Sequence, residues 1–319
     1  ATEPFDCWVH GRDANGEELP PRKLPGYETD ALTDLFINYV TRDGSDPFFA
    51  VLSVLAPHPR YEAPASFMAR HDPSRIVLRP NVPPVARIQE EARQSLARYY
   101  ATIENFDWNV GRIIATLEKK GLMENTVIIF FSDHGDMHGS HARLGKSVPW
   151  EEAIRVPFFV LGSGIKTDRQ HYPELINHVD IAPTALGLCG IDPPVDMRGT
   201  DYSGAYRNDR PEPNAPDSAF LQLVDPAGPS GMNADRERPW RGIITDDGWK
   251  YAVLEGQPWL LYNLNEDPFE TANLALDPYF SAERSRLQER LATWVADTGD
   301  QFQLPADIVH GRTYPRKWW

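Results

Sequence analysis

Four consecutive residues, Asp133-His134-Gly135-Asp136, are the part of the sequence best suited to chemistry. They follow an apolar run at 126–132 that we expect to form a strand, and ligands of open α/β sheets bind at the carboxyl ends of strands. A carboxylate beside an imidazole makes a suitable pair of divalent-metal ligands there, and Gly135 permits a tight turn. In isolation such a tripeptide more often has a structural role, in which Asp133 caps the next turn and His134 bonds to the backbone.

The elements that would position these residues read as an α/β layered domain in the first two hundred residues. Residues 1–30 are polar and rich in proline and glycine, and we expect a surface segment without regular structure. Beyond them, apolar runs and helical periodicity predict the following order: helix 30–39, buried strand 48–55, loop 62–86, long helix 88–120 ended by Gly121, strand 126–132, strand 156–161 and helix 180–190.

The composition changes near Gly199, which suggests a second structural region. Residues 204–239 are rich in Pro, Asn, Asp and Arg and read as loop. Three short strands at 241–245, 249–254 and 259–262 and a helix at 282–297 follow, which predicts a small antiparallel sheet plus a helix. We therefore divide the chain into an α/β core at 1–203 and an α+β subdomain at 204–319.

Composition and charge exclude several classes of partner. The chain has 319 residues, 41% hydrophobic and 24% charged, with a formal net charge of -14. That charge disfavours nucleic acid and anionic membranes, and the apolar runs are too short to cross a bilayer. The two cysteines, Cys7 and Cys189, cannot form a disulfide framework. They do not decide between a cytoplasmic and a periplasmic localisation.

The residues that follow the Asp-His-Gly-Asp run resemble the sulfatase family of the alkaline phosphatase superfamily. The family pattern, D-H-G-[DE]-x-x-G-x-H-x-x-x-x-K followed by E-E-x-x-R-V-P, fits this sequence from Asp133 through Lys146 to Pro157. Further matches are Pro47 to Pro59, His178 to Thr184, Trp249 to Tyr251 and Leu261 to Leu264. The resemblance implies part of an alkaline-phosphatase-like α/β/α sandwich, and it covers nearly the whole chain from about Pro47 to Gly299.

By position, this resemblance assigns roles to four residues. Asp133 and His134 would bind one divalent metal ion, Ca²⁺ or Mn²⁺ with Mg²⁺ as a third choice. Lys146 would hold the non-bridging or leaving oxygens of a sulfuryl or phosphoryl group, and His58 would donate a proton or hydrogen bond near the leaving oxygen. Without the resemblance to the family, we would interpret Lys146 as a solvated lysine and His58 as a turn residue.

The family's nucleophile has no counterpart in this sequence. Sulfatases use C-x-P-S-R, whose cysteine or serine becomes formylglycine, and neither Cys7 nor Cys189 stands in such a motif. The family's early Asp-Asp metal pair is also absent, so the sequence resembles the family's C-terminal two-thirds. We expect a fragment or a cleavage product that is completed by an N-terminal segment, with a non-catalytic relative as the third explanation.

The resemblance thus implies part of a metal-dependent hydrolase of sulfate esters. The alternatives are a phosphonate or phosphate ester hydrolase on the same scaffold and a non-catalytic, sulfatase-like binding protein. The expected partners are a small-molecule sulfate or phosphonate ester and the missing N-terminal segment, without nucleic acid or membrane; a homo-oligomer is allowed.

Overall fold

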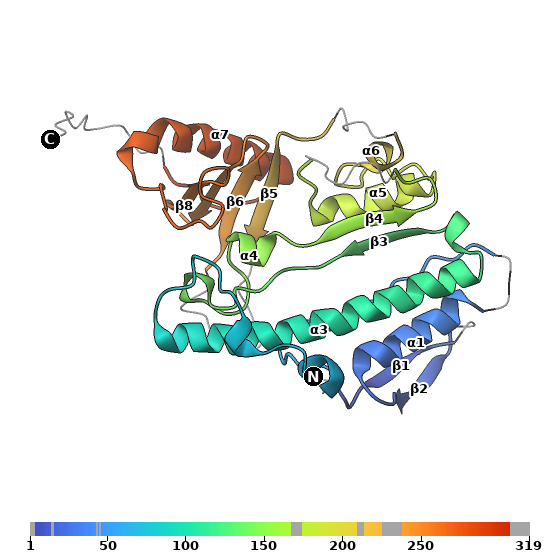
Figure 1. Cartoon of the computed structure of the whole chain (residues 1–319). Helices are drawn as coiled ribbons and strands as arrows, with labels where there is room; N and C mark the ends of the chain where they lie inside the picture. The colour runs from blue at the N-terminus through green and yellow to red at the C-terminus, as the bar shows by residue number, and fades with distance from the viewer. Residues whose placement is uncertain are drawn as a thin grey trace. The chain divides into compact units, whose positions relative to one another are not determined.

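The structure, a computed structural model of the chain, describes residues 4–13, 16–42, 44, 46–166, 174–208, 214–224 and 238–306 (Figure 1). The chain divides into two compact units, one of residues 1–128 and 138–143, the other of residues 129–137 and 144–319. The domain boundary that we place at residue 203 stays a prediction. None of the described helices is long and apolar enough to cross a bilayer.

The first unit is built around one long helix. Its elements are β1 (Trp8–Arg12), β2 (Glu18–Lys23), α1 (Glu28–Val40), α2 (Ala65–Met68) and α3 (Ala86–Lys119). Helix α3 confirms the predicted helix, and Gly121 follows it with a φ of 69°. Asn105 and Asn109 are fully buried on α3 and donate to one Oδ of Asp30 on α1 at 2.9 and 2.7 Å, which joins the two helices.

Two features of this unit differ from the prediction. Residues 1–30 contain an antiparallel hairpin, β1 with β2, which the two prolines of β2 disguise because proline is confined to sheet edges. The predicted buried strand at 48–55 is wrong for this chain: the segment forms no strand in the described structure, and Phe49 and Val51 are 81% and 70% exposed. No neighbouring strand in the described residues covers this apolar segment.

The second unit begins inside β3 (Val127–Phe131), the strand that leads to Asp133. Strand β3 pairs with β4 (Phe158–Gly162), and the rings of Phe130 and Phe159 stack with their centroids 4.5 Å apart. The short helix α4 (Glu151–Ile154) lies between them in sequence, and α5 (Ile181–Leu188) and α6 (Ser203–Asn208) follow β4. These strands and helix α5 confirm the corresponding predictions.

A four-stranded antiparallel sheet completes the second unit. Its strands are β5 (Ser218–Leu223), β6 (Trp240–Thr245), β7 (Trp249–Leu254) and β8 (Gln257–Asn263), in that spatial order. Strands β6 to β8 and helix α7 (Ser281–Thr298) confirm the predicted sheet and helix, whereas β5 lies in a region predicted as loop. Parts of that region, residues 209–213 and 225–237, lie outside the described residues.

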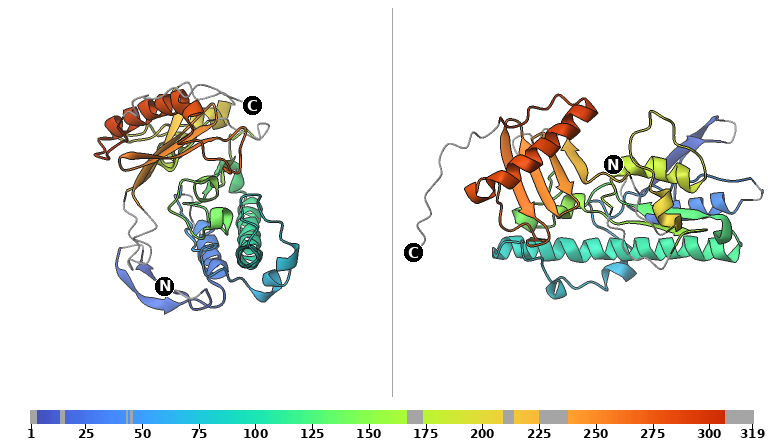
Figure 2. Two further views of the ribbon diagram at one scale, coloured as in Figure 1. Left: turned by 90° about the vertical axis from the view of Figure 1, so that its left-hand side faces the viewer. Right: turned by 90° about the horizontal axis from the view of Figure 1, so that it is seen from above.

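The sheet is covered on both faces, because side chains alternate along each strand. Helix α7 lies across one face, where Tyr251 and Val253 pack against Leu287 and Leu291 (Figure 2). On the opposite face, Ala252 and its neighbours on β8 pack against a cluster that precedes and includes α4, formed by Met137, Val148, Trp150 and Ala153. The sheet therefore supports the segment that directly follows Lys146.

Candidate active site

The Asp133-His134 pair lies just beyond the end of β3, as predicted. The carboxylate of Asp133 is 82% exposed, and its Oδ2 lies 3.5 Å from Nε2 of His134. Nδ1 of His134 lies 2.9 Å from the carbonyl oxygen of Gly135 and must be the protonated nitrogen, because a carbonyl can only accept. In the neutral imidazole this leaves the lone pair on Nε2, beside the carboxylate, which is the arrangement that a metal ligand needs.

The structural role that an isolated tripeptide allows is present as well. Asp133 accepts the backbone N–H of His134 at 2.8 Å, and the hydroxyl of Ser132 donates to the carbonyl of His134 at 2.9 Å. His178, from the segment before α5, places Nε2 2.8 Å from the carbonyl of Ser132. These bonds fix the backbone on both sides of Asp133 and so orient its carboxylate and the imidazole.

Gly135 occupies a position that admits no side chain. Its N–H donates to the carbonyl of Ala153 at 2.8 Å, and a Cβ at residue 135 would lie 1.9 Å from the carbonyl oxygen of Glu152. That contact is far below any van der Waals separation, so the turn and α4 approach each other more closely than an L side chain allows. The sequence pattern D-H-G and the following E-E-x-x-R are thus linked through direct backbone contact.

Lys146 follows a loop that is closed by its own hydrogen bonds. Asp136 accepts the N–H of Gly145 at 3.1 Å, and the N–H of Met137 donates to the carbonyl of Gly145 at 2.8 Å. Met137 is fully buried, Lys146 is half-buried, and the next residue, Ser147, has a φ of 75°. The position of Lys146 is therefore set by the ends of the loop that carries it.

A buried charge cluster supports the start of α4. The ammonium of Lys250 is fully buried on β7 and lies 2.6 Å from Glu270 and 2.7 Å from Glu151. It also donates to the carbonyl of Pro149 at 2.9 Å, and Glu270 accepts the N–H of Glu151 at 2.7 Å. Burial raises the pKa of Glu270 to about 7 even though Lys250 opposes the shift.

Sequence reasoning did not find this cluster. Lys250 lies in a stretch that resembles the family, but the resemblance assigns it no role. The only signal is a lysine flanked by aromatic residues in an apolar strand, Trp249-Lys250-Tyr251. A lysine at such a position has to be paired, because an isolated buried charge is too costly.

The remaining predicted residue, His58, belongs to the first unit. Its imidazole is exposed, and its Nδ1 faces the carbonyl of Pro59. Its backbone N–H donates to the carbonyl of Leu55 at 2.9 Å. Two other histidines of this unit have structural surroundings: His138 packs against Tyr99 and bonds to Ser95, and His141 bonds to Asn81.

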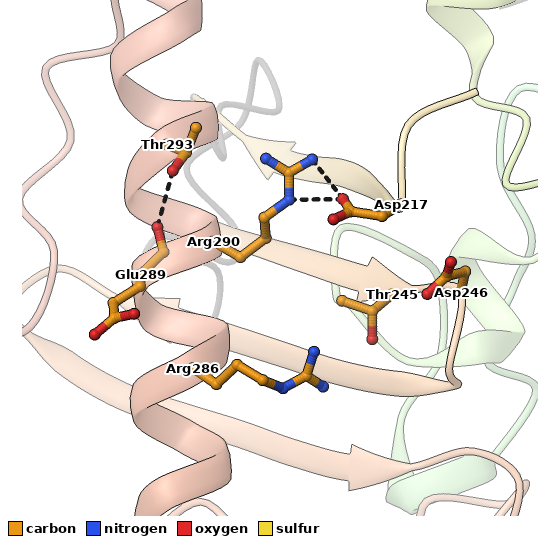
Figure 3. A pocket seen from close by; sticks show the side chains of 7 residues that line it. All are labelled: Asp217, Thr245, Asp246, Arg286, Glu289, Arg290 and Thr293. Carbon is orange, nitrogen blue, oxygen red and sulfur yellow. Dashed lines mark hydrogen bonds and ion pairs between the residues drawn. The ribbon is translucent and has the colours of Figure 1, made fainter. Parts of the chain in front are cut away.

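A separate pocket of about 330 Å³ lies against helix α7 (Figure 3). Its two arginines are engaged by carboxylates, Arg290 by Asp217 and Arg286 by Glu283 and Asp247. With its cations already neutralised, the pocket offers no attraction to a sulfate or phosphate group.

Comparison with known proteins shows where this geometry belongs. The profile "Sulfatase" matches residues 6–191, and the profile "N-sulphoglucosamine sulphohydrolase, C-terminal" matches residues 139–297. The chain belongs to the sulfatase family. A sulfatase of Formosa agariphila that is described as ulvan-active is 32% identical over 302 residues, which are 88% of this chain and 57% of that protein.

Solved structures agree on the fold. The yidJ protein of Bacteroides fragilis superimposes with a TM-score of 0.80 at 25% identity, over 94% of this chain and 65% of that one. The phosphonate monoester hydrolase of Agrobacterium radiobacter gives a TM-score of 0.71 at 24% identity, over 91% of this chain and 64% of that one. The predicted sulfatase-type, alkaline-phosphatase-like α/β fold is confirmed. The chain spans little more than half the length of its ulvan-active relative.

Proposed function

We propose that this chain forms part of a metal-dependent sulfuric ester hydrolase and carries one half of its active site. The observation that carries the proposal is the geometry at residues 133–135: His134 presents Nε2 as an acceptor beside the carboxylate of Asp133, in a sulfatase-family turn closed by Gly135. An exposed carboxylate next to an imidazole lone pair is suited to bind a cation. A purely structural turn would not need this arrangement.

Asp133 and His134 fit one divalent ion, Ca²⁺, Mn²⁺ or Mg²⁺, as two of its ligands. In the described structure no third carboxylate or imidazole forms a ligand group with them, so the remaining ligands come from outside these residues. A bound ion would supply positive charge for the oxygens of the sulfuryl group.

The roles that the family pattern implies for Lys146 and for His58 are two separate proposals. The ammonium of Lys146 would stabilise negative charge on the non-bridging or leaving oxygens, and the imidazole of His58 would donate to the leaving oxygen. The formal charge of -14 makes such local cations necessary, because the protein as a whole repels an anionic substrate.

The nucleophile, expected to be formylglycine, would come from an N-terminal segment of the same protein. Two observations support this proposal: the chain covers 57% of its ulvan-active relative, and the apolar segment 47–55 forms no strand and has no strand partner in the described structure. An exposed apolar strand edge is a template for a further strand.

The substrate is proposed to be a sulfate ester of a carbohydrate. The support is the ulvan-active relative, which matches 88% of this chain. A phosphonate or phosphate ester remains the second candidate, because the Asp133-His134 pair and Lys146 suit a phosphoryl group equally well.

The decisive experiment uses the protein expressed from its complete coding sequence with a formylglycine-generating system. Turnover of ulvan, an aryl sulfate, an aryl phosphate diester and a phosphonate monoester is compared with and without each metal. Metal-dependent release of sulfate supports the proposal, and faster turnover of the phosphorus esters favours the second candidate. Inertness toward all four substrates with metal present would make the chain a binding protein.

A further inference from the structure

Two buried donors on adjacent strands reach the backbone immediately after Lys146. The indole N–H of Trp240, on β6, donates to the carbonyl of Ser147 at 3.0 Å. The ammonium of Lys250, on β7, donates to the carbonyl of Pro149 at 2.9 Å. Trp240 is 4% exposed and Lys250 is fully buried, so both donor residues are shielded from water.

The conformation that these bonds hold is a strained one. Ser147 has a φ of 75°, in the left-handed region that a residue with a Cβ rarely adopts. Such a conformation is unfavourable and persists only where surrounding contacts impose it. The carbonyl of Ser147, the residue directly after Lys146, accepts the hydrogen bond from Trp240.

The same support continues to the metal-binding turn. Lys250 is paired with Glu151, the first residue of α4, and Glu270 accepts the N–H of Glu151. Two residues further along α4, the carbonyl of Ala153 accepts the N–H of Gly135. Polar contacts thus lead from the sheet to the backbone after Lys146 and, through α4, to the turn that holds Asp133.

We propose that Trp240 and Lys250 are positioning residues for hydrolysis, which fix the backbone after Lys146 so that its ammonium meets the sulfuryl oxygens. This inference rests on the proposed function. The physical reason is that the position of a lysine side chain follows the peptide planes beside it, and a misplacement of about 1 Å at a reacting group can cost roughly a hundredfold in rate.

The test begins with Trp240→Phe in the complete protein, which removes the donor and keeps an aromatic ring. Its matched control is Trp294→Phe, because the partly buried indole of Trp294 donates to Ser218 Oγ at 2.9 Å, on the opposite side of the sheet from Lys146. We expect Trp240→Phe to lower kcat by roughly tenfold with little change in KM, and Trp294→Phe to stay within about twofold of the parent.

A double-mutant cycle separates positioning from general stability. If Trp240 acts through Lys146, the loss caused by Trp240→Phe shrinks to less than about twofold in a Lys146→Ala background. Undiminished losses in that background, or equal losses in Trp240→Phe and Trp294→Phe, overturn the inference.

Lys250→Met is carried through the same cycle, and coupling to Lys146 supports the inference there as well. Failure of both Trp240→Phe and Lys250→Met to melt cooperatively would assign these residues to stability alone and overturn the inference. A parent protein that hydrolyses no ester refutes the proposed function instead, so the two failures are distinguishable.

Discussion

The backbone N–H of Gly135 donates to the carbonyl oxygen of Ala153 over 2.8 Å, so the turn that carries Asp133 and His134 rests directly on helix α4. A Cβ at residue 135 would lie 1.9 Å from the carbonyl oxygen of Glu152. The glycine of D-H-G is thus required by a neighbouring backbone as well as by its own turn. This contact explains why the two halves of the family pattern belong together.

Gly135→Ala should therefore separate the turn from α4. We expect a loss of at least tenfold in kcat/KM, and a loss of stability of roughly 1–3 kcal/mol because a backbone or helix has to shift. The control is Gly111→Ala in the middle of α3, where a Cβ meets nothing within 4 Å. That substitution should stabilise the protein by about 0.5–1 kcal/mol. Thermal melts and kinetics of both variants check the prediction, and an unchanged Gly135→Ala protein would contradict it.

Metal affinity should depend on Asp133 and His134 together. Asp133→Asn and His134→Ala each remove one ligand, and we expect the affinity of the complete protein for its divalent ion to fall by at least roughly tenfold. Titration calorimetry after chelator treatment measures this, with the exposed residue Asp196 providing Asp196→Asn as a charge-matched control. If both site variants retain the parent affinity, the proposed ligands are wrong.

The buried carboxylate of Glu270 should make stability depend on pH. Burial raises its pKa from 4.5 to about 7, so between these values the folded protein keeps a proton that the unfolded chain releases. The contribution of this group to stability is therefore greatest below about pH 4.5, falls as the pH rises to about 7 and is constant above that. The total change is roughly 3 kcal/mol.

Glu270→Gln should remove this dependence, because the amide does not titrate. Chemical denaturation between pH 5 and 8 measures the slope for the parent and the variant. The exposed Glu255 supplies the control, since Glu255→Gln should keep the parent slope. A slope that survives in Glu270→Gln would mean that another group is responsible.

The sequence predicted the elements whose pattern is local. The apolar periodicity of α3 with its terminal glycine and the apolar run of β3 each encode an element through neighbouring residues. The Asp133-His134 pair was found for the same reason, since its chemistry lies in adjacent residues at the end of a strand.

The features that the sequence did not reveal depend on partners far along the chain. Glu151 lies 99 positions before Lys250 and 119 before Glu270, and only the folded chain brings the three residues into one ion cluster. The segment 47–55 has the composition of a buried strand, but burial requires neighbouring strands that composition does not specify. Phe49, Val51 and Leu55 are exposed in the described structure because no neighbouring strand covers them there.

Charged substitutions in this exposed segment should affect stability differently in two forms of the protein. Phe49 and Val51 are 81% and 70% exposed, so Phe49→Lys and Val51→Lys should leave the melting temperature of the isolated 319-residue chain nearly unchanged and reduce its aggregation. In the complete protein, where we propose that an N-terminal segment pairs with residues 47–55, the same changes bury a charge and should destabilise it by at least about 2 kcal/mol. Light scattering and thermal melts of both forms measure this, and Val77→Lys, at a residue 88% exposed outside the segment, is the control. Equal tolerance of all three substitutions in the complete protein would show that the segment has no partner there.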